Sequence, residues 1–229
     1  MESYLSEDEL EAIHFKHRGK DIRISRMAVF YSPEKIEIGN HVRIDDFAFL
    51  SGGGGICIGD YVHIAAYSAL HGKFGIEISD YVNISSRVSI YSTSDDYSGE
   101  FMTGPLVNQQ YIHDIGKKIV IEEHVIIGTG SVLLPGAILH RGAAVGAMSL
   151  IKQELQPFKI YAGIPAKYIK ERTKELLDKE KMLKSMEHQG GGINLFKLLF
   201  YTGLCAAKSL FFNQKRELYV CHYGGIHNA

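Results

Sequence analysis

The chain has little of what marks several common classes of protein. Its three cysteines cannot all pair with one another, and their spacing fits no zinc motif, so we expect no metal site. So few cysteines indicate a reducing compartment, and we expect a cytoplasmic protein. The formal net charge is −1, so no basic excess points to nucleic acid as a partner. The first residues are acidic and contain no apolar run, so we expect no signal peptide.

An internal repeat of twenty residues runs from residue 36 to residue 90. Three segments align as IEIGNHVRIDDFAFLSGGGG, ICIGDYVHIAAYSALHGKFG and IEISDYVNISSRVSIYS. The repeat returns at Ile119 as IVIEEHVIIGTGSVLLPG, with large aliphatic residues every six positions. Because repeats of this length are typical of solenoids, the repeat decides the architecture that we predict.

The finer pattern predicts short strands that close into triangular coils. Alternate residues within each segment are apolar, which is typical of a strand with one buried face. Turn residues such as Gly59-Asp60 follow the apolar positions and bend the chain. Three segments then make one coil of about eighteen residues, and the two extra residues of the early coils bulge at one corner. Since one coil cannot bury its own apolar face, we predict an all-β solenoid in which the coils stack as a parallel β-helix. Four aligned segments disfavour the alternative, a β-sandwich.

The six-residue pattern resembles that of the hexapeptide-repeat acyltransferases. The resemblance covers about residues 20–172 and is strongest in IIGTGSVLLPGAILHRGAAVGAMSLI and the later YAGIPAKYIKER, where the chain is most similar to galactoside, maltose and polysaccharide sugar acetyltransferases. It implies a left-handed β-helix, acetyl-CoA as co-substrate and a homotrimer.

We divide the chain into three parts: a capping helix at 1–20, a β-helix at 21–165 with a loop insert at 92–118, and a C-terminal helical extension at 166–229. Ser6 and Glu9 fit a capping box, and we expect Gly19 to end the first helix. We expect an incomplete first coil at 22–30 and a helix from Lys167 to His188.

The most apolar stretch is 194–212, which Lys197, Gly203 and Lys208 interrupt. We interpret it as an amphipathic helix that packs on the β-helix or on another subunit. The alternative is contact with a membrane surface, where lipid-linked sugars are assembled.

The resemblance implies a set of acetyl-CoA contacts in the late coils and the exit loop. Small residues there let the pantetheine lie along the coils, and cations suit the nucleotide phosphates. The matching residues are Thr129, Ala147, Lys152, Gly163, Pro165, Lys167 and Lys170.

The acceptor side departs from the galactoside pattern. Asp95-Asp96 stands where those relatives carry a catalytic His-Pro, and Gly72-Lys73 stands where they carry an acidic pair that touches the sugar. A sugar hydroxyl needs a base near neutral pH, whereas the ordinary pKa of Asp is about 3.9. A sugar amine needs only orientation and a partner for its developing ammonium. We therefore expect Asp95 and Asp96, with Asn83 nearby, to orient an amine, unless they merely form a turn.

Three further residues are candidates for binding the acceptor: His63, His71 and Tyr97. We expect His63 and Asn83 to be neighbours in one column of the second strand of each coil. His71 lies one coil below the insert, which we interpret as a functional loop.

The pattern resembles acetyltransferases that N-acetylate nucleotide-linked amino sugars for lipopolysaccharide O-antigen, GDP-perosamine being one such substrate. The alternative is an O-acetyltransferase that uses His63, His71 or His113 as base. A γ-type carbonic anhydrase would need several histidines around a shared metal, and a sugar nucleotidyltransferase would need a phosphate-binding domain that residues 1–20 cannot hold. A purely structural β-helix would not need the GIPAK lysines.

Overall fold

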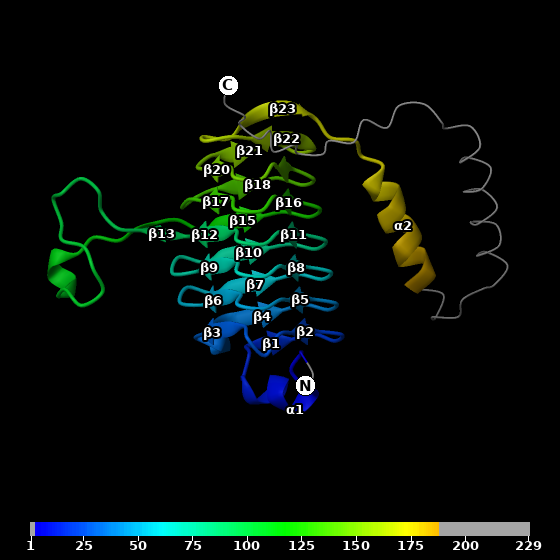
Figure 1. The fold of residues 1–229 in the computed structure, drawn as a ribbon, viewed down its shortest axis with the longest axis horizontal. Helices are drawn as coiled ribbons and strands as arrows, with labels where there is room; N and C mark the ends of the chain where they lie inside the picture. The colour runs from blue at the N-terminus through cyan, green and yellow to red at the C-terminus, as the bar shows by residue number, and fades with distance from the viewer. Residues whose placement is uncertain (1–2, 188–229) are drawn as a thin grey trace, which may run out of the picture. The chain divides into compact units, whose positions relative to one another are not determined.

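The computed structural model describes residues 3–187 and shows a parallel β-helix with an arm (Figure 1). Contacts divide the chain into two compact units, Met1–Lys174 and Glu175–Ala229. The β-helix predicted from the repeat is confirmed. The predicted amphipathic segment 194–212, with Cys205 and Cys221, lies outside the described residues.

Three sheets form the walls of the β-helix, and each complete coil contributes one parallel strand to each sheet. The first sheet contains β1 (His17–Arg18), β4 (Ile36–Ile38), β7 (Ile56–Ile58), β10 (Ile76–Ile78), β15 (Ile119–Ile121), β18 (Ile138–Leu139) and β21 (Glu154–Leu155). The second contains β2 (Arg23–Ile24), β5 (Arg43–Ile44), β8 (His63–Ile64), β11 (Asn83–Ile84), β16 (Ile126–Ile127), β19 (Ala144–Val145), β22 (Lys159–Ala162) and β23 (Lys167–Glu171). The third contains β3 (Val29–Tyr31), β6 (Phe49–Ser51), β9 (Ala69–His71), β12 (Ser89–Tyr91), β17 (Val132–Leu133) and β20 (Leu150–Ile151).

The aligned columns of the repeat are the core. Ile56 pairs with Ile76, and Ile76 pairs with Ile119 across the insert, so the register continues through the interruption. All three side chains are at most 1% exposed. Burial of such side chains contributes about 1.5–3 kcal/mol each, which makes the stacked columns the main stabilising feature.

Glycine stands at the corner after the first strand of the first three coils, where the next coil comes very close, and Ser79 takes that place after β10. A Cβ on Gly39 would lie 2.4 Å from Asp60 Oδ1, and one on Gly59 would lie 2.4 Å from Asp80 Oδ1. The Asp80 carboxylate accepts a hydrogen bond from the Asp60 amide at 2.8 Å. The predicted turn residues are therefore also the residues that join one coil to the next.

Rings stack along the same corner. His41, Tyr61, Tyr81 and His124 all have positive φ and form a continuous stack, with centroids 4.5–5.0 Å apart. A positive φ is uncommon for such residues. Stacked rings contribute about 0.5–1.5 kcal/mol per pair, which offsets part of the cost of that conformation.

The first helix is shorter than the sequence suggested. α1 (Glu7–Ala12) has the predicted capping box of Ser6 and Glu9, but it ends at Ala12 and not at Gly19. Gly19 is a corner glycine instead, because its Cβ would lie 2.6 Å from the Gly39 carbonyl carbon. The first coil therefore begins at β1 and has all three strands, so the expectation of an incomplete coil at 22–30 was wrong.

The exit segment also differs from the prediction. Lys167–Glu171 is strand β23, which pairs antiparallel with β22, whereas a helix was expected from Lys167. An open last coil exposes unpaired backbone groups, and β23 folds back to satisfy them. The helix begins only at α2 (Leu176–Glu187). Within residues 3–187, no helix is long and apolar enough to cross a membrane.

Candidate functional site

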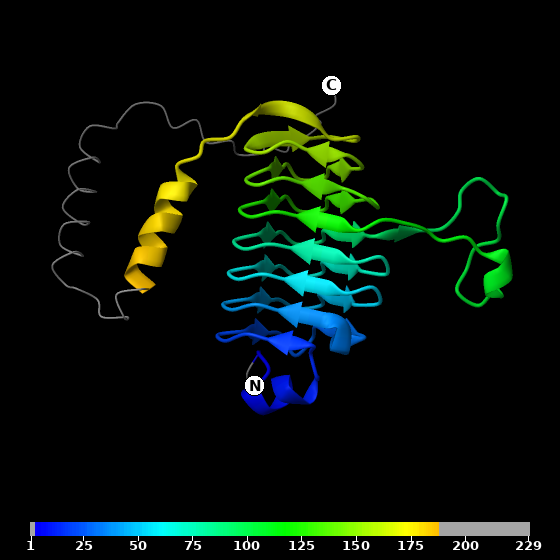
Figure 2. The ribbon, with the colours of Figure 1, turned by 180° about the vertical axis from the view of Figure 1, so that it is seen from behind.

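The insert forms an arm that leaves the β-helix after β12. We call residues 92–118 the arm. Its base is a two-stranded antiparallel ribbon of β13 (Thr93–Ser94) and β14 (Ile115–Gly116), and its outer part carries the 3-10 turn η2 (Gln109–Tyr111). A second 3-10 turn, η1 (Pro33–Lys35), precedes β4. Figures 1 and 2 show the arm projecting to the side of the coils.

The arm is fastened to the coil below it. The buried Ser92 hydroxyl donates to the His71 carbonyl at 2.9 Å and accepts from the Phe74 amide at 2.9 Å. The Phe74 ring packs so closely on Gly116 that a Cβ there would lie 2.0 Å from a ring carbon. Lys73, after β9, forms an ion pair with Asp114 of the arm. These contacts hold both strands of the ribbon at its base.

A cavity of about 700 Å³ lies where the arm meets the third sheet, and we call it the arm cavity. Its size falls within the range of small-molecule sites. The structure brings together three of the predicted acceptor residues, His71, Asp95 and Tyr97, in its wall. The other lining residues are Lys73, Tyr91, Thr93, Ser94, Gly104, Pro105, Gln109, Ile112, Asp114 and Leu134.

The two adjacent aspartates of the arm differ in their surroundings. Asp96 accepts hydrogen bonds from the Ser98 amide at 3.0 Å, the Ser98 hydroxyl at 2.8 Å and the Phe101 amide at 3.2 Å. The Ser98 amide and hydroxyl, with the Phe101 amide, hold the pKa of Asp96 below its usual range. Asp96 thus organises a turn. The Asp95 carboxylate lines the cavity, and no side chain or amide within residues 3–187 hydrogen-bonds to it.

His71 is a flat, uncharged wall of the cavity at neutral pH. Its ring stacks on Tyr91 with centroids 4.7 Å apart and an interplanar angle of 8°. Burial lowers the pKa of His71 below the ordinary histidine value of 6.5. A neutral imidazole can accept a proton, so the residue that the O-acetyltransferase alternative needs is also present.

His63 and Asn83 are neighbours, as predicted, but they lie on the second sheet and not in the arm cavity. His63 Nδ1 is 3.1 Å from Asn83 Oδ1, and His63 Nε2 is 2.8 Å from Asp45 Oδ2. Both ring nitrogens are therefore engaged within the column. Within one chain, the structure separates this group from Asp95.

Three of the residues predicted to contact acetyl-CoA, the acyl donor, lie along the corner between the second and third sheets. Thr129 and Ala147 are both exposed and lie on successive coils, joined by the hydrogen bond from the Met148 amide to the Thr129 carbonyl at 2.8 Å. The Thr129 hydroxyl donates to the Ser86 carbonyl at 2.6 Å. Gly163 packs on the next level, where its amide donates to Ser149 Oγ at 3.1 Å. Three of the predicted contacts thus form a line along the corner.

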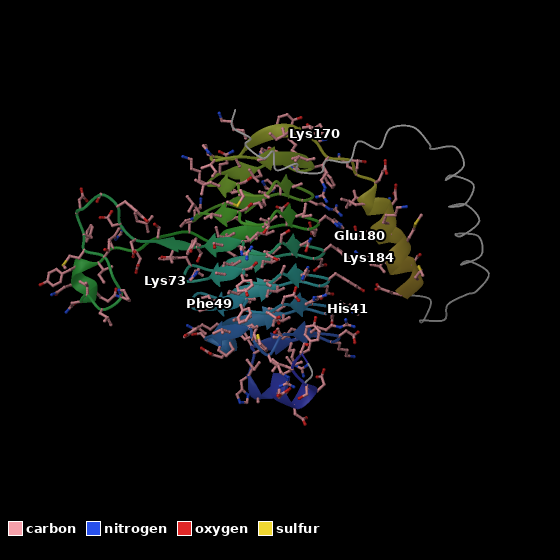
Figure 3. All side chains as sticks on the ribbon, in the orientation of Figure 1. His41, Phe49, Lys73, Lys170, Glu180 and Lys184 are labelled. Atoms are coloured by element: carbon pink, nitrogen blue, oxygen red, sulfur yellow. The ribbon has the colours of Figure 1, made fainter. Side chains whose placement is uncertain are left out.

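The other four residues predicted to contact acetyl-CoA are exposed and lie at the C-terminal end of the β-helix. They are Lys152, Pro165, Lys167 and Lys170. Figure 3 shows Lys170 at the last coil, on β23. No ion pair of either β23 lysine occurs within residues 3–187, so their charges remain available to an anion.

The corner that carries Thr129, Ala147 and Gly163 and the arm cavity lie at opposite ends of the strands of the third sheet. Thr129 precedes β17, whereas Leu134 follows it and lines the arm cavity. Five extended residues span up to about 17 Å, which is much longer than a bond-forming approach. The reacting groups must therefore meet across the outer face of this sheet or come from two copies of the chain.

Some cavity residues were not predicted from the sequence. Lys73 was noticed only as a departure from the galactoside pattern, and its partner Asp114 not at all. Tyr91 pairs with His71 in the third sheet, and the stacking of their rings was not predicted. An ion pair between a coil and an arm 41 residues later leaves no periodic signal that could have revealed it.

Comparisons with known proteins fit this geometry. No family model matches the chain. The chain is 50% identical over 183 residues to dTDP-4-amino-4,6-dideoxy-D-glucose acyltransferase from Escherichia coli, an alignment that covers 80% of this chain and 95% of that protein.

Solved structures give the same result. The chain is similar to AntD, an N-acyltransferase from Bacillus cereus in complex with dTDP and 3-hydroxybutyryl-CoA, at 44% identity and a TM-score of 0.78, covering 82% of this chain and all of the other. A variant of AntD in complex with dTDP-4-amino-4,6-dideoxyglucose and coenzyme A is also 44% identical, with a TM-score of 0.77, covering 81% of this chain and all of the other.

Proposed function

This chain belongs to the hexapeptide-repeat, left-handed β-helix family of sugar N-acyltransferases, and on that premise we propose that its acceptor is a nucleotide-linked 4-amino-4,6-dideoxy sugar. The donor is acetyl-CoA or a closely related thioester. The Asp95 carboxylate, exposed in the wall of the arm cavity, is the observation that carries the proposal. It offers an anion where galactoside-type relatives have a histidine.

The reaction is attack of a neutral amine on a thioester. The amine nitrogen forms a bond to the acyl carbon, the C–S bond breaks, the amine loses a proton, and the CoA sulfur ends as a thiol. Asp95 orients the amine and stabilises the positive charge that develops on it. No strong base is needed, because the neutral amine is already nucleophilic.

Within the proposed class, the relatives favour a dTDP sugar. The relative from E. coli and the AntD complexes both concern dTDP-4-amino-4,6-dideoxyglucose. GDP-perosamine, the example suggested by the sequence, carries the same 4-amino-4,6-dideoxy pattern on a different nucleotide. The O-antigen pathway, the homotrimer and the cytoplasmic location stay predictions.

A turnover screen tests the proposal. Acetyl-CoA is supplied with dTDP-4-amino-4,6-dideoxyglucose, with GDP-perosamine and with the 4-hydroxy analogue of each, and release of CoA thiol is followed. We expect turnover of an amine and none of its hydroxyl counterpart. If a hydroxyl sugar is turned over efficiently and His71→Ala abolishes that turnover, the proposed N-acyltransferase activity is wrong and the chain is an O-acyltransferase.

A further inference from the structure

The Asp95 carboxylate depends on the backbone of the arm for its position. No side chain or amide within residues 3–187 hydrogen-bonds to it. Asp95 directly follows β13, and β13 forms two residue pairs with β14. A two-stranded ribbon on its own is marginally stable at best in water. The position of Asp95 is therefore set by the contacts that hold this short ribbon.

Phe74 contacts both sides of the ribbon's base. The three atoms nearest to a Cβ on Gly116 are all carbons of the Phe74 ring, so the ring lies directly against the backbone of β14. The Phe74 amide donates to Ser92 Oγ at 2.9 Å, and Ser92 immediately precedes β13. The Lys117 amide donates to the Ser92 carbonyl at 3.0 Å and closes the base. One residue of the coil below thus holds the start of one strand and the face of the other.

We infer that Phe74 is a positioning residue for the reaction: by packing on Gly116 it sets where Asp95 lies in the wall of the arm cavity. The inference rests on the proposed function, since Asp95 is the residue that orients the amine there. Phe74, Ser92 and Gly116 do not line the cavity themselves. In this chain they act through the residues that do.

The size of the effect follows from how closely a reacting group must be placed. A displacement of about 1 Å can cost about 100-fold in rate. Without the ring, β14 loses the contact that fixes its distance from the coil, and Asp95 moves with the ribbon. Because Phe74 acts through Asp95, its removal costs no more than removal of the Asp95 charge.

A different role for Phe74 would be purely structural. In that case its ring, which is 41% exposed, only covers the corner of the coil. Phe74→Ala would then lower stability, and any loss in kcat would be independent of Asp95. Independent losses multiply in a double variant, whereas losses that act through one group do not.

Steady-state rates of the full-length protein with acetyl-CoA and the better amino sugar of the turnover screen separate the two roles. We expect Phe74→Ala to lower kcat by about 10- to 100-fold, with little change in the KM for acetyl-CoA. Phe74→Tyr, which keeps the ring, should retain most of kcat. In the Asp95→Asn background, Phe74→Ala should lower kcat by less than about 2-fold.

Tyr31→Ala is the matched control. Tyr31 is 57% exposed, packs on Phe49 and lies on β3, three strands from β12 in the third sheet, so its loss should leave kcat unchanged.

Gly116→Ala gives a second measurement of the same contact. The added Cβ would collide with the Phe74 ring, so the ribbon must shift and kcat should fall. Once Phe74→Ala has removed the ring, the collision is gone, and Gly116→Ala should change kcat little. Losses that multiply in this double variant would contradict a contact between the two residues.

Hydrogen exchange tests the positioning without any substrate. Phe74→Ala should speed exchange of the amides of β13 and β14 and leave those of the coils unchanged. Unchanged exchange in the ribbon, or losses in kcat that multiply in Phe74→Ala with Asp95→Asn, would overturn the inference. If wild type turns over no amino sugar, or Asp95→Asn keeps full kcat, the proposed function fails, and exchange alone then decides whether Phe74 sets the position of Asp95.

Discussion

At the scale of single residues, the proposed chemistry depends on a carboxylate that faces a cavity without a hydrogen-bond donor from the described chain. Asp95 and Asp96 are adjacent in sequence, but only Asp95 is available to a ligand, because Asp96 accepts hydrogen bonds from Ser98 and Phe101. The sequence predicted both as one pair. It could not separate them, since their difference arises from the fold of a loop that has no period.

Asp95→Asn should lower kcat by about 10- to 100-fold, because the developing ammonium loses a charge-assisted hydrogen bond. For wild type, kcat/KM should rise with pH as the substrate amine, with a pKa of roughly 8, loses its proton. Steady-state rates between pH 6 and 9 measure both effects. His63→Ala and His71→Ala should lower kcat by less than Asp95→Asn does. A larger decrease in kcat from either histidine variant would contradict the role of Asp95 as the residue that orients the amine.

Lys167→Glu with Lys170→Glu should raise the KM for acetyl-CoA by one or two orders of magnitude, at roughly 1–2 kcal/mol for each lost charged hydrogen bond. The acceptor KM should hardly change. Initial rates with each substrate varied in turn give both constants. Equal weakening of both substrates would show that β23 acts only as a cap of the last coil.

At the scale of elements, the six-residue period predicted the strands and the core columns. It failed at the two ends of the β-helix. His17–Arg18 pairs as a strand and Lys167–Glu171 folds back as one, although both stretches were predicted to be helical. Edge pairing of coils overrides local propensity there, and a repeat gives no information once its own pattern stops.

Gly59→Ala tests the close approach of coils at a corner. The added Cβ would lie 2.4 Å from Asp80 Oδ1 and 2.9 Å from the Asp80 amide nitrogen, so the corner must shift. We expect a loss of about 1–3 kcal/mol in the free energy of unfolding, measured by denaturant titration. Gly53→Ala is the control, since its Cβ would meet only an ordinary contact at 3.6 Å. Equal stability of the two variants would contradict the role of Gly59.

A pH-dependent contribution to stability comes from His140. Its Nε2 lies 2.6 Å from Glu154 Oε1, and its Nδ1 lies 2.9 Å from Glu122 Oε1. The hydrogen bond to Glu154, and to a smaller extent the one to Glu122, raise the pKa of His140. Because the pKa of His140 is higher in the folded protein, the stabilisation is fully present below the pKa of about 6.5 in the unfolded chain. It is lost as pH rises through the pKa of His140 in the folded protein.

His140→Gln should therefore destabilise the protein more at pH 5.5 than at pH 9. The difference should be about 1 kcal/mol or less, because both ion pairs are partly exposed. Denaturant titration at the two pH values measures it, and His113→Gln on the arm serves as the comparison. A loss that does not depend on pH would show that His140 only packs.

At the scale of the whole molecule, one chain holds Thr129 of the predicted acetyl-CoA site and Leu134 of the arm cavity at opposite ends of a third-sheet strand. The arm also exposes large apolar side chains, among them Leu106 at 99% and Tyr97 at 92%. Surfaces of this kind are typical of protein contacts. Both observations support the prediction that copies of the chain assemble.

Sedimentation should show a homotrimer of the 25.6 kDa chain. Leu106→Asp should shift the assembly toward smaller species and lower kcat/KM, because a charge at this position is costly to bury in a contact. A stable monomer with full activity would contradict the trimer, and trimers unaffected by Leu106→Asp would remove the arm tip from the interface.

The stacking of coils also gives the molecule a fixed unit of length. Residues of one column rise by one coil spacing, about 4.8 Å. The arm leaves after β12, and Thr129 lies in the next coil, which pairs directly with it. Strand pairing is kept only when a complete coil is inserted or removed. The axial offset between the arm and the corner that carries Thr129 can therefore change only by whole coil spacings. The coil spacing of the β-helix thus sets the axial distance that the thioester must cover to meet the amine.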